Sequence, residues 1–151
     1  MQHKKLLFAL TVLLFVSLPT QAQEQRVLLK NVPPAVQQTV KEQSKDAKVR
    51  GITKEMEQGK TIYELETVVN GHTRDLLIDA DGKVTEVEEQ VALSALPAPV
   101  KDAIVKQAGK GRIVRVEAVT KNDKLEFYEA QVRRLGKLSE IKVSPEGQPI
   151  K

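Results

Sequence analysis

Few side chains in this sequence could carry out catalysis. The chain has no cysteine, and its two histidines are His3 and His72. His72 directly follows the pair Asn70-Gly71, where a solvated residue beside a turn is the expected role. Without cysteine or a second histidine nearby, the chain can build neither a histidine-based triad nor a zinc site. We therefore predict that the protein is not an enzyme and uses no cofactor.

Acidic side chains are the remaining candidates for chemistry. Glu55 with Glu57, and Glu64 with Glu66, place two carboxylates on one face of a strand, because alternate strand residues point the same way. Acid-base catalysis would need an environment that shifts the pKa of one carboxyl. The solubility of an exposed strand explains these pairs equally well, so we assign them no catalytic role.

The segment DADGK, Asp79 to Lys83, is similar to the start of a calcium-binding loop. Such a loop carries a bidentate glutamate at its twelfth position, and here that position is Gln90. The corresponding later segment, SPEGQ from Ser144, keeps the glycine and lacks both aspartates. We predict no metal site, and calcium or small-ligand sensing in the cell envelope remains the alternative function.

All these residues lie in a sequence that repeats itself once. VPPAVQQTV from Val32 matches LPAPVKDAI from Leu96 at an offset of 64, and IYELETVVNG from Ile62 matches FYEAQVRRLG from Phe127 at an offset of 65. Two copies of this length indicate a tandem duplication rather than a solenoid. We predict repeat 1 over 23–92 and repeat 2 over 93–151.

Each copy predicts one short helix followed by an antiparallel meander, an α+β plan. Prolines suit the first helical turn, and the apolar stripe of Val36, Val40 and Ala47 recurs as Val100, Ile104 and Ala108. Asn70-Gly71 is a strong signal for a tight hairpin turn. The predicted strands are 49–57, 61–69, 73–78 and 84–89, then 112–120, 124–134 and 137–143. The offset of the first strand stays open between 64 and 65, and a fourth strand in repeat 2 is doubtful.

One face of this sheet is predicted to stay uncovered. Tyr63 and Leu65, with Tyr128 and Ala130, are the more apolar set and should face the helices. The opposite set supplies the candidate partner-binding residues, with two exposed apolar anchors among charges. They are Ile62, Glu64, Glu66, Phe127, Glu129 and Arg133. The alternative is an ordinary solvated sheet face, on which single apolar residues are common.

The N-terminus has the pattern of a secretory signal peptide. Lys4 and Lys5 precede an apolar run over 6–18, and Thr20 and Ala22 suit the small-residue positions before a cleavage site. The run is shorter than the roughly 20 residues that cross a bilayer. We predict a signal peptide over 1–22 cleaved after Ala22, a periplasmic or secreted protein, and no membrane span after cleavage. Removal of residues 1–22 lowers the formal charge from +4 to +2, which does not indicate nucleic-acid binding.

The repeated motifs carry a family resemblance. They are the helix starts Val32-Pro33 and Leu96-Pro97, the pairs Tyr63-Glu64 and Tyr128-Glu129, and IDADGKV from Ile78. With them the chain resembles the PepSY-like domain family, also described as similar to beta-lactamase-inhibitor proteins. The resemblance implies an exported bacterial protein whose two repeats line up their strands in one broad sheet that cradles a partner. PepSY modules occur in propeptides of secreted metallopeptidases, so it also implies inhibition of a separate secreted or periplasmic peptidase through the open sheet face.

Overall fold

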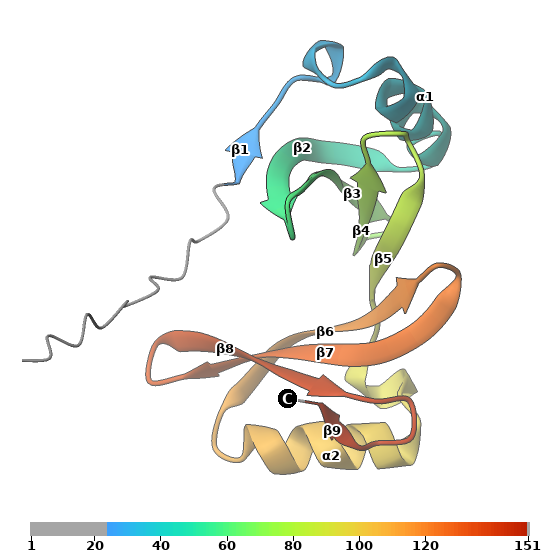
Figure 1. Cartoon of the computed structure of the whole chain (residues 1–151). Coiled ribbons are helices and arrows are strands. Elements are labelled where there is room, and N and C mark those ends of the chain that lie inside the picture. The colour runs from blue at the N-terminus through green and yellow to red at the C-terminus, as the bar shows by residue number, and fades with distance from the viewer. Residues whose placement is uncertain (1–23, 151) are drawn as a thin grey trace, which may run out of the picture.

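A computed structural model describes residues 24–150, which form one nine-stranded antiparallel sheet and two α-helices (Figure 1). Every strand pairs with its neighbour in sequence, so the spatial order is the chain order. This confirms the predicted α+β fold. The elements are β1 (Gln25–Arg26), the 3₁₀ turn η1 (Leu29–Asn31), α1 (Pro34–Gln43), β2 (Lys48–Glu57), β3 (Lys60–Val69), β4 (His72–Asp79), β5 (Val84–Gln90), the 3₁₀ turn η2 (Leu93–Ala95), α2 (Ala98–Ala108), β6 (Arg112–Lys121), β7 (Lys124–Arg134), β8 (Lys137–Val143) and β9 (Pro149–Ile150).

Both helices pack on the same face of the sheet, one over each repeat. Val87 of β5 packs against the core under α1, and its partner across the junction of the repeats is Thr120 of β6. Because strand side chains alternate, Val116 of β6 points to the same face as Thr120, and Val116 belongs to the core under α2. In Figure 1, α1 and α2 lie at opposite ends of the sheet. No helix of residues 24–150 covers the other face.

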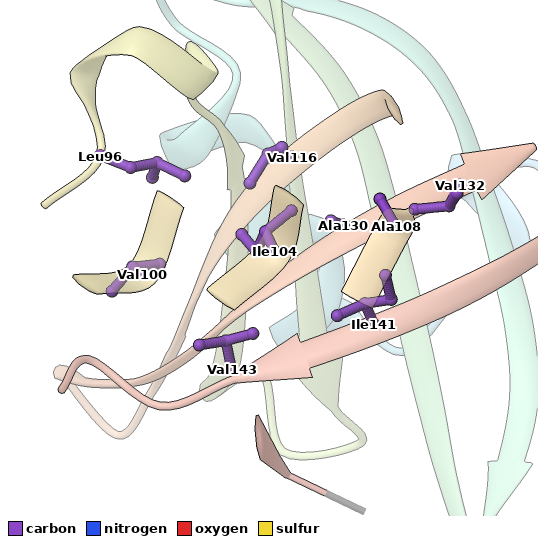
Figure 2. Close-up of a cluster of buried hydrophobic side chains, with 9 residues drawn as sticks. All are labelled: Leu96, Val100, Ile104, Ala108, Val116, Ala130, Val132, Ile141 and Val143. Atoms are coloured by element: carbon purple, nitrogen blue, oxygen red, sulfur yellow. The ribbon is translucent and has the colours of Figure 1, made fainter. Parts of the chain in front are cut away.

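The protein has two hydrophobic cores of similar construction. Under α1, the residues Val36 and Val40 meet a set of inward strand residues, Ile52, Tyr63, Leu65, Leu76 and Ile78. Under α2, as Figure 2 shows, Val100, Ile104 and Ala108 meet Val116, Ala130, Val132, Ile141 and Val143. The predicted stripe is therefore the buried face of α2, and Val36 and Val40 form that of α1, whereas Ala47 lies beyond the end of α1.

A glycine turn docks against the start of the helix in each repeat. A Cβ on Gly82 would lie 2.8 Å from the backbone of Ala35, and one on Gly147 would lie 2.7 Å from that of Pro99. Both glycines also have positive φ, +84° and +86°, a region that favours glycine. Ala35 and Pro99 differ by 64 and the glycines by 65, so the structure preserves both offsets of the sequence repeat.

A bulge in β7 explains why the offset changes. Thr120 pairs with Leu125, whereas the preceding Val119 pairs with Phe127, so Glu126 is the inserted residue. Before the bulge, Ile52 and Val116 hold equivalent core positions. The first strand therefore follows the offset of 64, which the sequence left open.

Short strands finish both edges of the sheet. The strand β1, which the sequence did not predict, pairs with β2 through Gln25 and Arg26. The doubtful fourth strand of repeat 2 exists as the two-residue β9, which pairs with Lys142 and Val143. Within residues 24–150 no helix is long and apolar enough to cross a membrane. The predicted signal peptide over 1–22 lies outside the described residues.

Candidate binding face of the sheet

The sheet face opposite the helices, called the open face below, has an acidic centre. Hydrogen-bonded register places Glu66, Asp75 and Glu88 directly opposite one another on β3, β4 and β5. The same row continues through Val119 on β6 to Phe127 on β7. The row therefore consists of three acidic residues followed by the apolar residues Val119 and Phe127, and it crosses the junction between the repeats.

The prediction that Ile62 is an exposed anchor is wrong. Its side chain lies on the open face but is only 6% exposed. Ile62 sits on a central strand between Glu55 of β2 and Asp79 of β4, and close cross-strand neighbours cover such a residue. Phe127, predicted to be equally exposed, is half-buried. Alternation along a strand gives the face of a side chain but not its depth.

The other predicted residues also lie on the open face, in different settings. Glu64 accepts a hydrogen bond from Thr53 Oγ1 at 3.1 Å. Glu66 and Glu129 form ion pairs, with Arg26 at 3.3 Å and with Lys142 at 3.0 Å respectively. Arg133 is exposed near the end of β7, opposite Leu138 of β8. Glu64 and Glu66 thus belong to the acidic centre, Phe127 and Glu129 to its apolar side, and Arg133 lies apart.

Four carboxylates of this centre were missed by the sequence interpretation, namely Asp75, Glu86, Glu88 and Glu117. The spacing of Glu86 and Glu88 on β5 puts both on one face, and this was the available signal. This spacing alone did not predict an acidic centre, because the sequence does not show which strand pairs with β5 across the junction of the repeats. The structure pairs Glu86 with Lys121 and Glu88 with Val119 of β6.

Burial and mutual repulsion raise the pKa of several of these carboxyls. Desolvation, followed by the charges of Glu117 and Glu86, raises the pKa of Glu88 to about 8. Burial also raises the pKa of Glu64 and of Asp75, although Asp75 accepts a hydrogen bond from the Thr67 amide at 3.0 Å. Glu88 is therefore largely protonated at neutral pH, because burial and the neighbouring carboxyls outweigh any nearby cation.

Cations reach both sides of the acidic centre but not its middle, and on the repeat 1 side Arg26 pairs with Glu66. Arg115 Nε lies 3.2 Å from Glu117, Lys121 Nζ lies 2.8 Å from Glu86, and Lys142 pairs with Glu129 as described above. Arg115, Lys121 and Lys142 all come from repeat 2. Among the described residues, Glu64, Asp75 and Glu88 form no ion pair within 4 Å.

The segment that is similar to a calcium loop uses its first aspartate to shape a turn. Asp79 Oδ1 accepts hydrogen bonds from the amides of Asp81 and Lys83, at 3.0 and 2.9 Å. In repeat 2, Ser144 Oγ accepts the equivalent bonds from the amides of Glu146 and Gln148. A serine replaces the aspartate without loss of the turn, so the carboxylate has a structural role. No group of three potential ligands within residues 24–150 could hold a metal ion.

Solved structures share this fold, although no family model and no curated protein matches the chain. A protein from Bacteroides eggerthii described as periplasmic is 20% identical, with a TM-score of 0.64 over 80% of this chain and 86% of the other. A DUF2874 family protein from Bacteroides uniformis is 18% identical, with a TM-score of 0.63 over 80% and 87%. A BLIP-like protein from Bacteroides fragilis is 18% identical, with a TM-score of 0.57 over 80% and 84%. The chain therefore has a BLIP-like fold.

Proposed function

We propose that this protein is an exported, non-enzymatic binding protein that holds a partner protein on the open face of its sheet. The observation that carries the proposal is the acidic row ending at the half-buried Phe127, on the face that the two described helices leave uncovered. Part-buried aromatic residues beside charges are typical of binding surfaces. Glu64, Glu66, Phe127, Glu129 and Arg133 are the proposed contact residues.

The proposals of export and of a peptidase partner are supported by the sequence and by the similarity to solved structures. The predicted signal peptide over 1–22 and the periplasmic description of the Bacteroides eggerthii neighbour both support a periplasmic or secreted location. The PepSY-like resemblance and the BLIP-like fold support inhibition of a secreted or periplasmic peptidase. An inhibitor needs to cover the active site of its target and requires no catalytic group of its own.

Capture from envelope extracts with matched variants tests the face. Phe127→Ser alters the open face, whereas Val105→Ser removes an exposed apolar residue of α2 on the helix side. We expect the wild type and Val105→Ser to recover the same partner and Phe127→Ser to lose it. Recovery of the same proteins by all three forms would contradict the proposal.

Inhibition is tested on whatever peptidase is captured. We expect the purified protein to slow cleavage of a large protein substrate, and Phe127→Ser to slow it less at equal concentration. A captured partner without peptidase activity would leave the binding role and remove the inhibitory one.

A further inference from the structure

We propose that the open face binds a cationic loop of its partner, and that Glu64, Asp75 and Glu88 hold an arginine or lysine side chain of that loop. This inference rests on the proposed function and specifies the chemistry of the partner. Four features of the face support it: its opposed like charges, an unsatisfied buried carboxylate, its apolar end, and the contrast between the repeats.

Acidic side chains lie directly opposite one another at several points of the open face. Glu66, Asp75 and Glu88 are successive cross-strand neighbours, and Glu117 opposes Glu129 on β6 and β7. Directly opposed like charges destabilise a sheet. A cation placed among them would relieve that repulsion, so the arrangement favours a positively charged ligand.

Glu117 provides an independent sign of missing donors. The residue is 2% exposed, and its Oε1 atom accepts no hydrogen bond within the described part of the chain. Arg115 Nε lies 3.2 Å away but also forms no hydrogen bond, because the geometry does not suit one. A buried carboxylate oxygen without a donor is costly. Glu117 Oε1 itself is buried, but the guanidinium of a bound arginine carries five N–H donors that match the more accessible carboxylates beside it.

The second repeat shows that the fold does not require this lack of cations. Glu64 pairs across the strands with Leu77, and the equivalent Glu129 pairs with Lys142. Lys142 Nζ reaches Glu129 at 3.0 Å, whereas Leu77 offers Glu64 no charge. Repeat 1 therefore keeps a carboxylate without its cation at a position where the same fold accommodates a lysine.

The apolar end of the row indicates what should accompany the cation. Val119 and Phe127 continue the row of acids, and the Phe127 ring lies 5.8 Å from Lys121 Nζ and 5.1 Å from Lys142 Nζ. These lysines already serve Glu86 and Glu129, so they are poorly placed to recruit an anion. A loop that pairs an arginine with a neighbouring apolar side chain fits the whole row.

Two blocked peptides test the proposal, Gly-Leu-Arg-Arg-Phe-Gly and Gly-Leu-Gln-Gln-Phe-Gly. Each is titrated at millimolar concentration into isotope-labelled protein while amide chemical shifts are followed. We expect the arginine peptide to shift amides of β3, β4 and β5 around Glu64, Asp75 and Glu88, and the glutamine peptide to bind at least about tenfold more weakly. Binding of the arginine peptide should weaken with added salt.

Three variants assign the effect to the carboxylates. The double variant Glu64→Gln/Glu88→Gln should weaken the arginine peptide about tenfold or more, and Leu77→Lys should do the same by supplying an internal cation. Glu89→Gln removes an exposed carboxylate from the helix side of β5 and should change nothing. Neutral glutamines relieve repulsion, so the double variant should fold. A melting temperature for each variant checks that a loss of binding is not a loss of fold.

Several outcomes would overturn the inference. Equal binding of both peptides, or unchanged affinity of Glu64→Gln/Glu88→Gln for the arginine peptide, would show that the face does not recognise a cationic side chain. Calcium chloride that shifts the same amides when the arginine peptide does not would indicate an ion site instead. If the molecular mass of the protein in solution rises with its concentration, and is lower in Arg133→Ala, the occupant of the open face is a second copy of the protein. If a captured partner still depends on Phe127 while the arginine peptide does not bind, the proposed function stands and this inference fails.

Discussion

Glu88 should make the stability of the protein depend strongly on pH. Its pKa in the folded protein is about 8, against 4.5 for an ordinary glutamate, so the folded state binds the proton more tightly than the unfolded chain. Stability from this proton is full below the unfolded pKa and is lost as the pH rises through the folded one. The free energy of unfolding should therefore fall between about pH 5 and pH 9.

The size of the effect follows from the same pKa values. The full difference corresponds to about 5 kcal/mol, and solvent at the part-exposed carboxyl reduces this to about 2 to 3 kcal/mol. Glu88→Gln cannot ionise, so its free energy of unfolding should exceed that of the wild type by about this amount near pH 9. Near pH 5 the two proteins should differ little.

Urea denaturation across this range measures the difference directly. Glu89→Gln is the matched control, because it removes a carboxylate from the same strand on the opposite, exposed side. The control should follow the wild type at every pH. Parallel stability curves for the wild type and Glu88→Gln would refute the assignment of a raised pKa to Glu88.

Three further pairs of substitutions test individual features of the fold. Ile62→Asp should lower the free energy of unfolding by at least about 3 kcal/mol, because it buries a charge among acidic neighbours. Leu135→Asp, at an exposed turn, should change the free energy of unfolding little in the same urea titration. Gly147→Ala should lower the free energy of unfolding by about 2 to 4 kcal/mol, because the added Cβ would meet Pro99 and the backbone has a positive φ. At Gly136 the φ is also positive but the added Cβ meets no neighbour, so Gly136→Ala should lower it by only about 1 kcal/mol. Equal losses would mean that the turn at Gly147 does not dock against the helix. Asp79→Ala should lower the melting temperature, because it removes two accepted hydrogen bonds worth about 1 to 2 kcal/mol, and Asp79→Ser should restore it. If calcium chloride raises the melting temperature of the wild type but not of the variants, Asp79 has a metal-binding role instead.

Local signals were sufficient to predict most of the elements. Asn70 and Gly71 have positive φ, 51° and 86°, as the hairpin signal requires. The apolar stripe of each helix, beginning at Val36 and at Val100, became its buried face. These features depend on residues a few positions apart, and the repeat gave a second copy against which each could be compared.

The depth and charge of the open face could not be predicted in this way. Burial of Ile62 depends on its neighbours Glu55 and Asp79, which come from two other strands. The setting of Glu88 depends on the register between β5 and β6, which joins the repeats. No periodicity within one strand contains that register, so the acidic centre emerges only when the strands are assembled.

The junction of the repeats explains how the sheet can carry the proposed binding surface, which neither repeat holds alone. Each copy buries its own helix in its own core, so β5 and β6 are free to extend one sheet across the boundary. That pairing brings carboxylates of repeat 1 beside cations and an aromatic ring of repeat 2, as in the ion pair of Glu86 with Lys121. Equivalent positions have then diverged, with Leu77 in one copy and Lys142 in the other. The cores keep the symmetry that folding needs, and the open face has lost it where a partner would bind.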